Sequence, residues 1–252
     1  MKRRKTIADE TSIRPTTENR LLELVPAADR ARIAVKLERT PLEFRQVMFE
    51  EGKPIRYVYF PIDAVVSLLT VMEDGAAVEV GTIGSEGMVG MPLLLGASTS
   101  PGLAFAQIVG ESWRMAAEDF LPEVRRGGAF SDLLHRYMQY FFIQVSQSTA
   151  CNRLHPAEER CARWLLQSRE RVGKDDFPLT HEFLGQMLGV RRATVTIIAG
   201  ALQQAGLIEY RRGVVRILDV ERLEEASCEC YQKVRDEYAR VIGPQPPRNV
   251  RG

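Results

Sequence analysis

The stretch of sequence that decides the fold spans residues 179–219 and reads LTHEFLGQMLGVRRATVTIIAGALQQAGLIEYRRGVVRILD. Its first part has the signals of a short helix, with Thr180 as N-cap, an acid in the first turn and apolar residues at helical spacing. Gly189 is suited to end that helix, and one apolar residue separates it from a second periodic run over 191–205. Two helices joined by so short a turn indicate a helix-turn-helix. After Gly206 the pattern changes to alternation on both sides of Arg-Arg-Gly, which predicts a small hairpin, or wing.

The charges of this stretch are placed as in a DNA-binding unit. It holds five arginines and three acids, a balance of 5 − 3 = +2, whereas the whole chain has a formal net charge of +1. Two arginines open the second helix, the end that enters a major groove, and two lie at the wing tip, near backbone phosphates. The alternative is a two-helix packing unit whose arginines only solvate its surface, but turn, arginines and wing together favour DNA. The candidate DNA-contacting residues are Arg191, Arg192, Thr194, Thr196, Arg211 and Arg212.

Length and composition limit the class of protein. With 252 residues and 45% hydrophobic content, the chain is long enough for a buried core and for two domains. A net charge of +1 excludes a generally basic nucleic-acid binder, so any contact with DNA must be local. No apolar run approaches the roughly 18 residues of a membrane span, and no signal peptide opens the sequence. We therefore expect a cytoplasmic protein without membrane contact.

Residues 40–115 have the pattern of β structure. Short apolar or alternating segments recur between turn signals, which predicts an antiparallel sandwich or barrel, preceded by a helix over 21–37. The expected strands are 44–49, 55–60, 64–72, 76–83, 103–109 and 112–115.

Residues 87–102, GMVGMPLLLGASTSPG, interrupt the strand pattern. A short helix and loop packed on the barrel would have this composition. A ligand-cradling loop would have it too, because glycine lets the backbone approach a ligand closely. Both interpretations stay open. The candidate effector-pocket residues are Gly87, Met88, Gly90, Ser98, Thr99 and Ser100.

A long helix is predicted over 130–152. Two interleaved sevenfold series form a seam suited to a second copy of the helix, apolar at first and polar at its far end. The alternative is a helix packed wholly on its own barrel. His155-Pro156 should end this helix and act as a hinge, since a residue before proline resists the α region, and a further helix should follow to about Val172. The predicted dimer seam consists of Leu134, Met138, Phe141, Val145, Ser148 and Asn152.

The four cysteines give no recognised motif. Cys151 and Cys161 lie in helical patterns typical of buried structural thiols, and none of the four forms a Cys-x-x-Cys pair. Cys228-Glu-Cys230 leaves a redox or metal role open. Apart from that open question, the sequence shows no recognised metal or cofactor motif, and we expect neither a metal site nor a cofactor.

An enzyme is the alternative from another class. A catalytic metal in the β region would need clustered histidines, but His135, His155 and His181 all lie outside residues 40–115. His181-Glu182 begins a metalloprotease motif, yet its second histidine position is Gly185. We predict no catalytic residues.

The order of barrel, long helix, hinge and winged helix-turn-helix resembles the Crp/Fnr family of bacterial transcription regulators. The resemblance covers about residues 40–219 and is carried by Gly189, Arg192, Thr194, Val195, Gly206, Leu207 and Ile208. It implies a homodimer that binds double-stranded DNA, senses an effector through the barrel, and activates or represses promoters, with RNA polymerase as a further partner. A sensing module that acts only through protein contacts is the alternative within the same fold.

Two departures from the family pattern concern specificity. At the positions where cyclic-AMP-binding relatives read bases with Glu and Arg, this chain has Ala193 and Ile197. Their sensing domains also hold the ribose with a Glu and the cyclic phosphate with an Arg, whereas here Gly90 precedes Met-Pro and residues 97–102 contain no arginine. The N-terminal cysteine cluster of the iron–sulfur branch is missing as well. We expect a different target site and an effector other than cyclic AMP.

The expected fold class is α+β, with an N-terminal antiparallel, jelly-roll-like β-barrel, a long dimerisation helix and a C-terminal winged helix-turn-helix. A polar surface helix is expected over 220–242. The predicted divisions are a disordered basic tail over 1–19, an effector-sensing β-barrel domain over 20–128, a dimerisation helix and hinge over 129–155, a DNA-binding domain over 156–242 and a disordered tail over 243–252.

Overall fold

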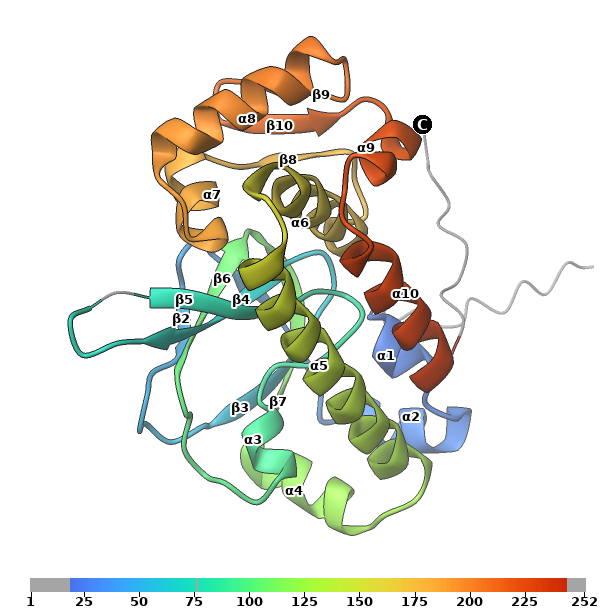
Figure 1. The fold of residues 1–252 in the computed structure, drawn as a ribbon. Helices are drawn as coiled ribbons and strands as arrows, with labels where there is room; N and C mark the ends of the chain where they lie inside the picture. The colour runs from blue at the N-terminus through green and yellow to red at the C-terminus, as the bar shows by residue number, and fades with distance from the viewer. Residues whose placement is uncertain (1–18, 76, 244–252) are drawn as a thin grey trace, which may run out of the picture.

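The computed structural model describes residues 19–75 and 77–243, and the long helix α5 (Ala129–Leu154) runs through its middle (Figure 1). Two β-sheets lie on one side of α5, and the last helix lies on the other. The winged helix-turn-helix lies beyond the C-terminal end of α5. The predicted α+β class and order of parts are confirmed. Among the described residues, no helix has both the length and the apolar character that crossing a membrane requires.

The β domain consists of two antiparallel sheets that do not close into a barrel. One sheet has the order β1-β7-β3 and the other β2-β6-β4-β5. Strand β1 was not predicted, because it is an edge strand whose proline and charged residues hide the alternation. The strands are β1 (Glu38–Leu42), β2 (Val47–Phe49), β3 (Tyr57–Pro61), β4 (Val65–Val71), β5 (Ala77–Ile83), β6 (Leu103–Ile108) and β7 (Gly110–Ala116).

Short helices cover the β domain. The single helix expected over 21–37 is two helices, α1 (Arg20–Glu23) and α2 (Ala27–Ala34), because Pro26 starts a new helix rather than continuing the first. The interrupted stretch 87–102 contains α3 (Met91–Leu94), and α4 (Ala117–Arg125) follows β7.

Residue 19 is ordered, although the sequence placed it in a disordered tail. Asn19 is buried, caps α1 by accepting from Leu22 N, and donates to the carbonyls of Pro61 and Gly87. The rest of the expected N-terminal tail, residues 1–18, and residues 244–252 lie outside the described residues.

The winged helix-turn-helix follows the sequence closely. Thr180 accepts from Phe183 N as the predicted cap of α7, and Gly189 ends that helix at φ 65°. The wing turns at Arg212 and Gly213, both with positive φ (49° and 79°), as a two-residue hairpin requires. The 173–178 loop contains a strand that was not predicted, β8, which pairs with β10. The elements are α6 (Ala157–Val172), β8 (Asp176–Pro178), α7 (His181–Leu188), α8 (Arg192–Gln204), β9 (Ile208–Arg211), β10 (Val214–Ile217) and α9 (Val220–Glu225).

The prediction of one polar surface helix over 220–242 is wrong. Residues 226–229 separate α9 from α10 (Cys230–Val241), and α10 lies along α5 (Figure 1). Its apolar face, with Val234 and Tyr238, is buried in the core of the β domain. The chain therefore returns from the wing to the N-terminal domain, so α10 does not pack as part of a separate 156–242 unit. The other domain boundaries remain predictions.

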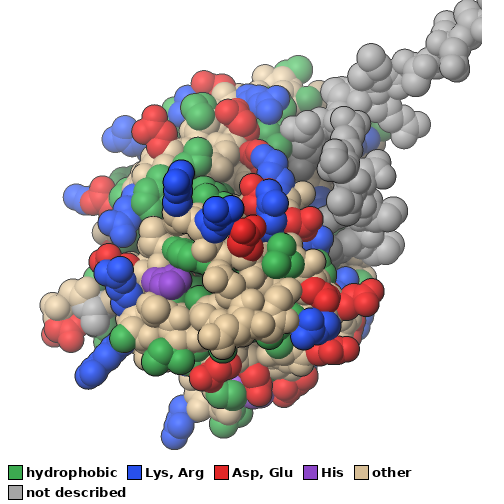
Figure 2. Space-filling view, turned by 90° about the horizontal axis from the view of Figure 1, so that it is seen from above, with side chains coloured by type: hydrophobic (Ala, Val, Ile, Leu, Met, Phe, Trp, Pro, Cys, Tyr) green, Lys and Arg blue, Asp and Glu red, His purple; other side chains and the backbone are tan. Residues whose placement is uncertain are grey.

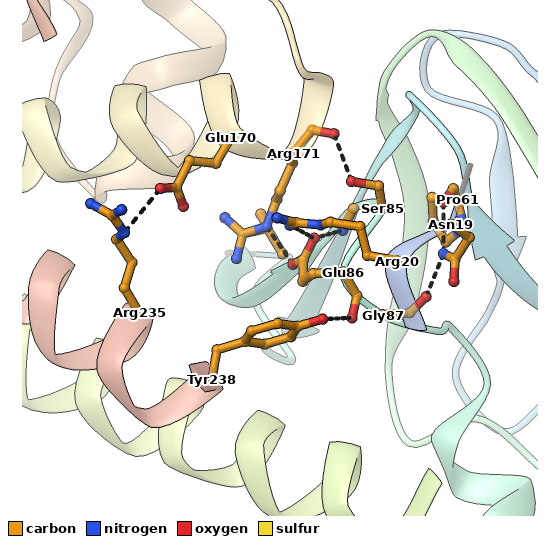
Figure 3. Close-up of polar contacts among 12 residues, drawn as sticks. Asn19, Arg20, Pro61, Ser85, Glu86, Gly87, Glu170, Arg171, Arg235 and Tyr238 are labelled. Atoms are coloured by element: carbon orange, nitrogen blue, oxygen red, sulfur yellow. Dashed lines mark hydrogen bonds and ion pairs between the residues drawn. The ribbon is translucent and has the colours of Figure 1, made fainter. Parts of the chain in front are cut away.

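A buried polar cluster, which we call the polar joint, connects the β domain to α6 and α10 (Figure 3). Arg171 Nε of α6 donates to Glu86 Oε1 over 2.8 Å, and both side chains are buried. Arg20 Nη2 lies 3.7 Å from the other carboxylate oxygen, and the Tyr238 hydroxyl donates to the Glu86 carbonyl over 3.2 Å. Burial opposes ionisation of Glu86, but the two arginines outweigh it and hold the pKa of Glu86 below its ordinary value.

The helix-turn-helix also docks directly on the second sheet. Phe183 of α7 meets Phe44 and Phe105 edge-on, with ring centroids 6.2 and 6.3 Å apart. Trp164 Nε1 of α6 donates to Glu79 Oε1 of β5 over 3.3 Å. Burial raises the pKa of Glu79 to about 7, although its hydrogen bonds favour the ionised form. The two domains therefore share apolar and titratable contacts.

Candidate nucleic-acid interface

The second helix of the helix-turn-helix, α8, presents its N-terminus to solvent. Arg191 is its N-cap and Arg192 its first residue, and both side chains are exposed. At the wing, Arg211 and Arg212 are exposed as well. Figure 2 looks onto this end of the molecule and shows Lys and Arg side chains, interspersed with some acids, over the helix-turn-helix. Four of the six predicted contact residues are thus exposed cationic side chains on this end, and Arg211 lies 3.7 Å from the Glu209 carboxylate.

The close packing of the two helices positions these arginines. Val195, Ile198 and Leu202 of α8 are buried in the core of the domain. A Cβ on Gly185 of α7 would lie 2.9 Å from the carbonyl oxygen of Val190, so only glycine lets the turn fold this tightly against α7. The buried face of α8 therefore fixes which residues point outward.

The two threonines among the predicted DNA-contacting residues differ in exposure. Thr194 is half-buried, whereas Thr196 is exposed. The Thr196 hydroxyl donates to the Arg192 carbonyl over 3.1 Å, and His181 Nδ1 lies 3.0 Å from the same hydroxyl oxygen. Because the Thr196 hydroxyl proton is already donated to the Arg192 carbonyl, the Thr196 oxygen accepts a hydrogen bond from the protonated Nδ1 of His181.

His181 was missed as a site residue. Its ring stacks on Tyr210 with centroids 4.4 Å apart, and Tyr210 donates to the Leu179 carbonyl over 2.6 Å. Burial, and next the charge of Arg192, lower the pKa of His181, so the ring is neutral near pH 7. Through these contacts His181 connects α7 to the recognition helix α8 and to strand β9 of the wing. The sequence carried no sign of this role, because Thr196 and Tyr210 lie 15 and 29 residues from His181 along the chain. The residue stood out only as the first half of an incomplete metalloprotease motif.

An exposed apolar residue lies among the polar ones. Ile197 of α8 has 73% of its surface exposed, and Ala193, one turn earlier, is also exposed. Neither can read a base by hydrogen bonding. An apolar side chain in a major groove contacts the thymine methyl group.

A separate cavity of about 310 Å³ lies between the second sheet and α5. Its lining includes Gly90 and Ser100 from the predicted effector pocket, together with Leu68, Phe141 and Val145. All of its lining residues are within the described part of the chain, and none of them is charged.

The other pocket candidates lie elsewhere. Gly87 packs against Tyr137 so closely that a Cβ would overlap the phenol hydroxyl, and Met88 is buried in the core. Ser98 and Thr99 are exposed at the edge of the domain, where they meet residues 54 and 55. Of the two glycines among the candidates, Gly87 allows close packing of α5, and Gly90 lines the cavity.

Helix α5 exposes a different face from the one expected. Leu134 is fully buried in the core, so it has no surface left for a partner. Phe141 and Ser148 turn toward their own chain: the Phe141 ring lies against Gly81 and Ser148 borders a small cavity near Glu79. The exposed series consists of His135, Phe142 and Thr149, beside the predicted Met138, Val145 and Asn152.

Comparison with known proteins agrees with this arrangement. Residues 159–226 match the family model of the Crp-like helix-turn-helix domain. A search of curated proteins found no significant match. Similar solved structures include a chain described as a transcriptional regulator of the Crp/Fnr family from Eubacterium rectale, at 16% identity and TM-score 0.63, covering 86% of this chain and 100% of that one.

Two further structures share the fold. FixK2 from Bradyrhizobium japonicum is 15% identical with a TM-score of 0.65, covering 76% of this chain and 98% of its own. The c-di-GMP-responsive global regulator CLP from Xanthomonas campestris is 17% identical with a TM-score of 0.59, covering 77% and 99%. The protein therefore has a Crp-like helix-turn-helix domain within the fold of the Crp/Fnr family of transcription regulators, as its sequence predicts.

Proposed function

We propose that the protein is a homodimeric, sequence-specific DNA-binding transcription regulator of the Crp/Fnr type that responds to an effector other than cyclic AMP. The observation that carries the proposal is the exposed N-terminus of α8, with Arg191 and Arg192, on the same end of the molecule as Arg211 and Arg212 of the wing. A recognition helix enters the major groove by its N-terminal residues, and wing arginines contact phosphates.

Base reading on this helix combines one cation with an apolar patch. Arg192, exposed at the start of α8, is proposed to donate to guanine O6 and N7, the commonest specific contact in a major groove. Ile197 and Ala193 favour thymine methyl groups instead of a hydrogen-bonded base. We infer a half-site with a guanine beside one or more thymines.

The homodimer is proposed to form through α5. Two helix-turn-helix units must be held about 34 Å apart to reach successive major grooves, and α5, with 26 residues, is the longest described helix. Positions 135, 142, 149 and 152 of this helix are exposed, and positions 138 and 145 are half-buried. Together these six positions alternate spacings of three and four, the pattern of a coiled-coil seam. Phe142, with 71% of its surface exposed, is the apolar centre of that seam.

The effector is proposed to bind in the cavity between the second sheet and α5. The lining is apolar apart from Thr70, Ser100 and backbone groups, so it suits an uncharged, largely apolar molecule. A cyclic phosphate would be desolvated there without a cation. A cyclic dinucleotide, the ligand named for the Xanthomonas regulator, would need arginines outside this cavity.

The same cavity offers a route from ligand to dimer. Met138, Phe141 and Val145 of α5 form one wall, and Met138 and Val145 also belong to the proposed seam. A ligand that fills the cavity would shift these side chains and change the preferred pairing of the two helices. RNA polymerase is the proposed partner once the dimer is on DNA.

Selection from a random double-stranded library tests the function. Enriched sequences should form an inverted repeat with half-sites one helical turn apart, and fluorescence anisotropy should show salt-dependent binding. Arg191→Ala and Arg211→Ala should weaken binding to all sequences, with Lys174→Ala, at an exposed residue outside the helix-turn-helix, as the matched control. Failure to enrich any sequence, with the fold intact, would favour the alternative of a sensing module that acts through protein contacts.

Calorimetry tests the effector. Millimolar cyclic AMP should give no saturable heat, because the cavity lacks a cation for its phosphate. Saturable binding that raises DNA affinity would contradict the proposal.

A further inference from the structure

Four side chains with metal-binding atoms gather where three segments meet, outside the DNA-binding face and the effector cavity. They are Cys151 near the end of α5, His155 in the hinge, and Cys228 and Cys230 at the start of α10. Their Sγ and imidazole nitrogen atoms all lie within 4.8 Å of one another. The three cysteines are buried and His155 is half-buried.

The spacing of these atoms matches a tetrahedral cage. A zinc ion bound at about 2.3 Å to sulfur and about 2.0 Å to nitrogen has ligand atoms roughly 3.5–3.8 Å apart. The sulfur atoms of Cys151 and Cys228 are 3.5 Å apart, and Cys230 Sγ lies 3.4 Å from His155 Nδ1. The four ligand atoms therefore already lie close enough together to surround one ion.

Neighbouring polar groups are placed to orient His155 and to stabilise a thiolate at Cys230. His155 Nδ1 lies 3.4 Å from Cys230 Sγ, and its Nε2 lies 3.3 Å from a carboxylate oxygen of Glu229. A carboxylate behind a histidine fixes its tautomer and increases its basicity as a ligand. Gln147 Nε2 donates to Cys230 Sγ over 3.0 Å, a hydrogen bond that stabilises a thiolate.

We propose that Cys151, His155, Cys228 and Cys230 bind one zinc ion in a tetrahedral Cys₃His site. Binding converts three thiols to thiolates, releases their protons to solvent and involves no redox change. The ion would tie the start of α10 to the hinge between α5 and α6. It would thus fix where the chain enters and leaves the DNA-binding domain.

Two other uses of the same residues fit less well. A Cys151–Cys228 disulfide would leave Cys230, His155 and the Glu229 contact without a role. A [2Fe–2S] cluster divides its ligands between two irons, which places ligands of different irons farther apart than this cage allows. The compact set of four favours a single ion.

Metal titration of the whole protein tests the site. Protein purified under reducing conditions and stripped with a chelator should bind one Co²⁺ per chain, with the visible bands of tetrahedral cobalt and near-ultraviolet thiolate-to-cobalt absorption. Zn²⁺ should bleach these bands and raise the melting temperature. Cys228→Ser and Cys230→Ser should each weaken cobalt binding and reduce the thiolate absorption per bound ion, whereas Cys161→Ser, at a buried thiol of α6 outside the cluster, should change neither.

A fourth variant guards against loss of folding in the cysteine variants. Glu229 has 73% of its side chain exposed, so Glu229→Gln should fold normally and weaken zinc affinity about tenfold to a hundredfold through His155. The proposal is overturned by absence of stoichiometric cobalt binding, by an iron–sulfur spectrum in protein as purified, by a Cys151–Cys228 disulfide that persists in reducing cells, or by unchanged affinity in Glu229→Gln. DNA binding is not part of the readout, so the proposed regulator function stands or fails separately.

Discussion

Removal of Arg171 from the polar joint should strongly destabilise the protein. The side chains of Arg171 and Glu86 are 5% and 4% exposed, and their ion pair joins α6 to the loop after β5. Arg171→Met keeps most of the side-chain volume and removes the charge. It leaves Glu86 buried with Arg20, 3.7 Å away, as its remaining cation, and Gln144 without its 3.3 Å hydrogen bond.

The magnitude follows from the buried carboxylate that is left behind. Removing one partner of a buried pair costs about 3–5 kcal/mol of unfolding free energy, because the other charge stays desolvated. Since Arg20 compensates in part, we expect a loss of about 2–4 kcal/mol. In the double variant Glu86→Gln, Arg171→Met no charge is stranded, so the loss should be clearly smaller than in Arg171→Met alone. Arg240→Met, which breaks an ion pair with a 61% exposed arginine, should change stability by less than about 0.5 kcal/mol.

Urea unfolding followed by circular dichroism and tryptophan fluorescence measures these differences. Trp113 lies in the β domain and Trp164 in α6, so fluorescence senses both sides of the joint. A loss below about 1 kcal/mol in Arg171→Met, or an equal loss in the double variant, would refute the reasoning.

Acid unfolding provides an independent check on the same pair. The pKa of Glu86 is depressed in the folded protein, so its contribution to stability is present above the ordinary carboxyl pKa and is lost as pH falls through the depressed value. Wild-type protein should therefore lose stability below about pH 4 more steeply than Glu86→Gln.

Three further outcomes are expected. Arg192→Ala should cost about 1–3 kcal/mol of specific binding and relax preference at one base pair, measured by anisotropy on single-substitution sites, and unchanged affinity would remove it from the interface. Sedimentation should show that Phe142→Asp is a folded monomer, whereas the control Gln139→Asp, at another exposed residue of α5, remains a dimer. If Phe142→Asp is still a dimer, the seam lies elsewhere. Because burial raises the pKa of Glu79 to about 7, the folded protein keeps the Glu79 carboxyl protonated at pH values where the unfolded chain has lost that proton. The free energy of unfolding should therefore fall by at most about 3 kcal/mol as pH rises from 5 through 7. If Glu79→Gln shows the same pH dependence, another group is responsible for it.

The DNA-binding unit could be predicted because its determinants are local. The cap at Thr180, the left-handed Gly189 and the two-residue wing turn each depend on residues within a few positions, and the structure has all three where the sequence placed them. Regular alternation likewise located most strands. An irregular edge strand such as β1, with a proline and two charged residues, gave no such signal.

Other features depended on which surfaces meet across the fold. The periodicity of α5 gave two apolar series but could not distinguish a face turned to its own sheet from one turned to solvent. The predicted seam therefore includes Leu134 and Phe141, which turn toward their own domain, and omits the exposed Phe142. In the same way, the sequence left both a ligand loop and a packing connection open for residues 87–102, and only the structure shows that the missing side chain of Gly87 lets Tyr137 pack against it.

The sequence by itself determined the helix-turn-helix, its arginines and the β–α–winged-helix order, because short-range hydrogen bonding and periodic burial specify them. Only the tertiary structure decided where α10 packs. That packing brings Cys228 and Cys230 next to Cys151, although Cys151 and Cys228 are 77 residues apart in the sequence. A tetrahedral site needs atoms a few ångströms apart in space and no particular distance along the chain. Since four cysteines without a spacing motif carry no local signal, the site appears only when the last helix returns to the hinge.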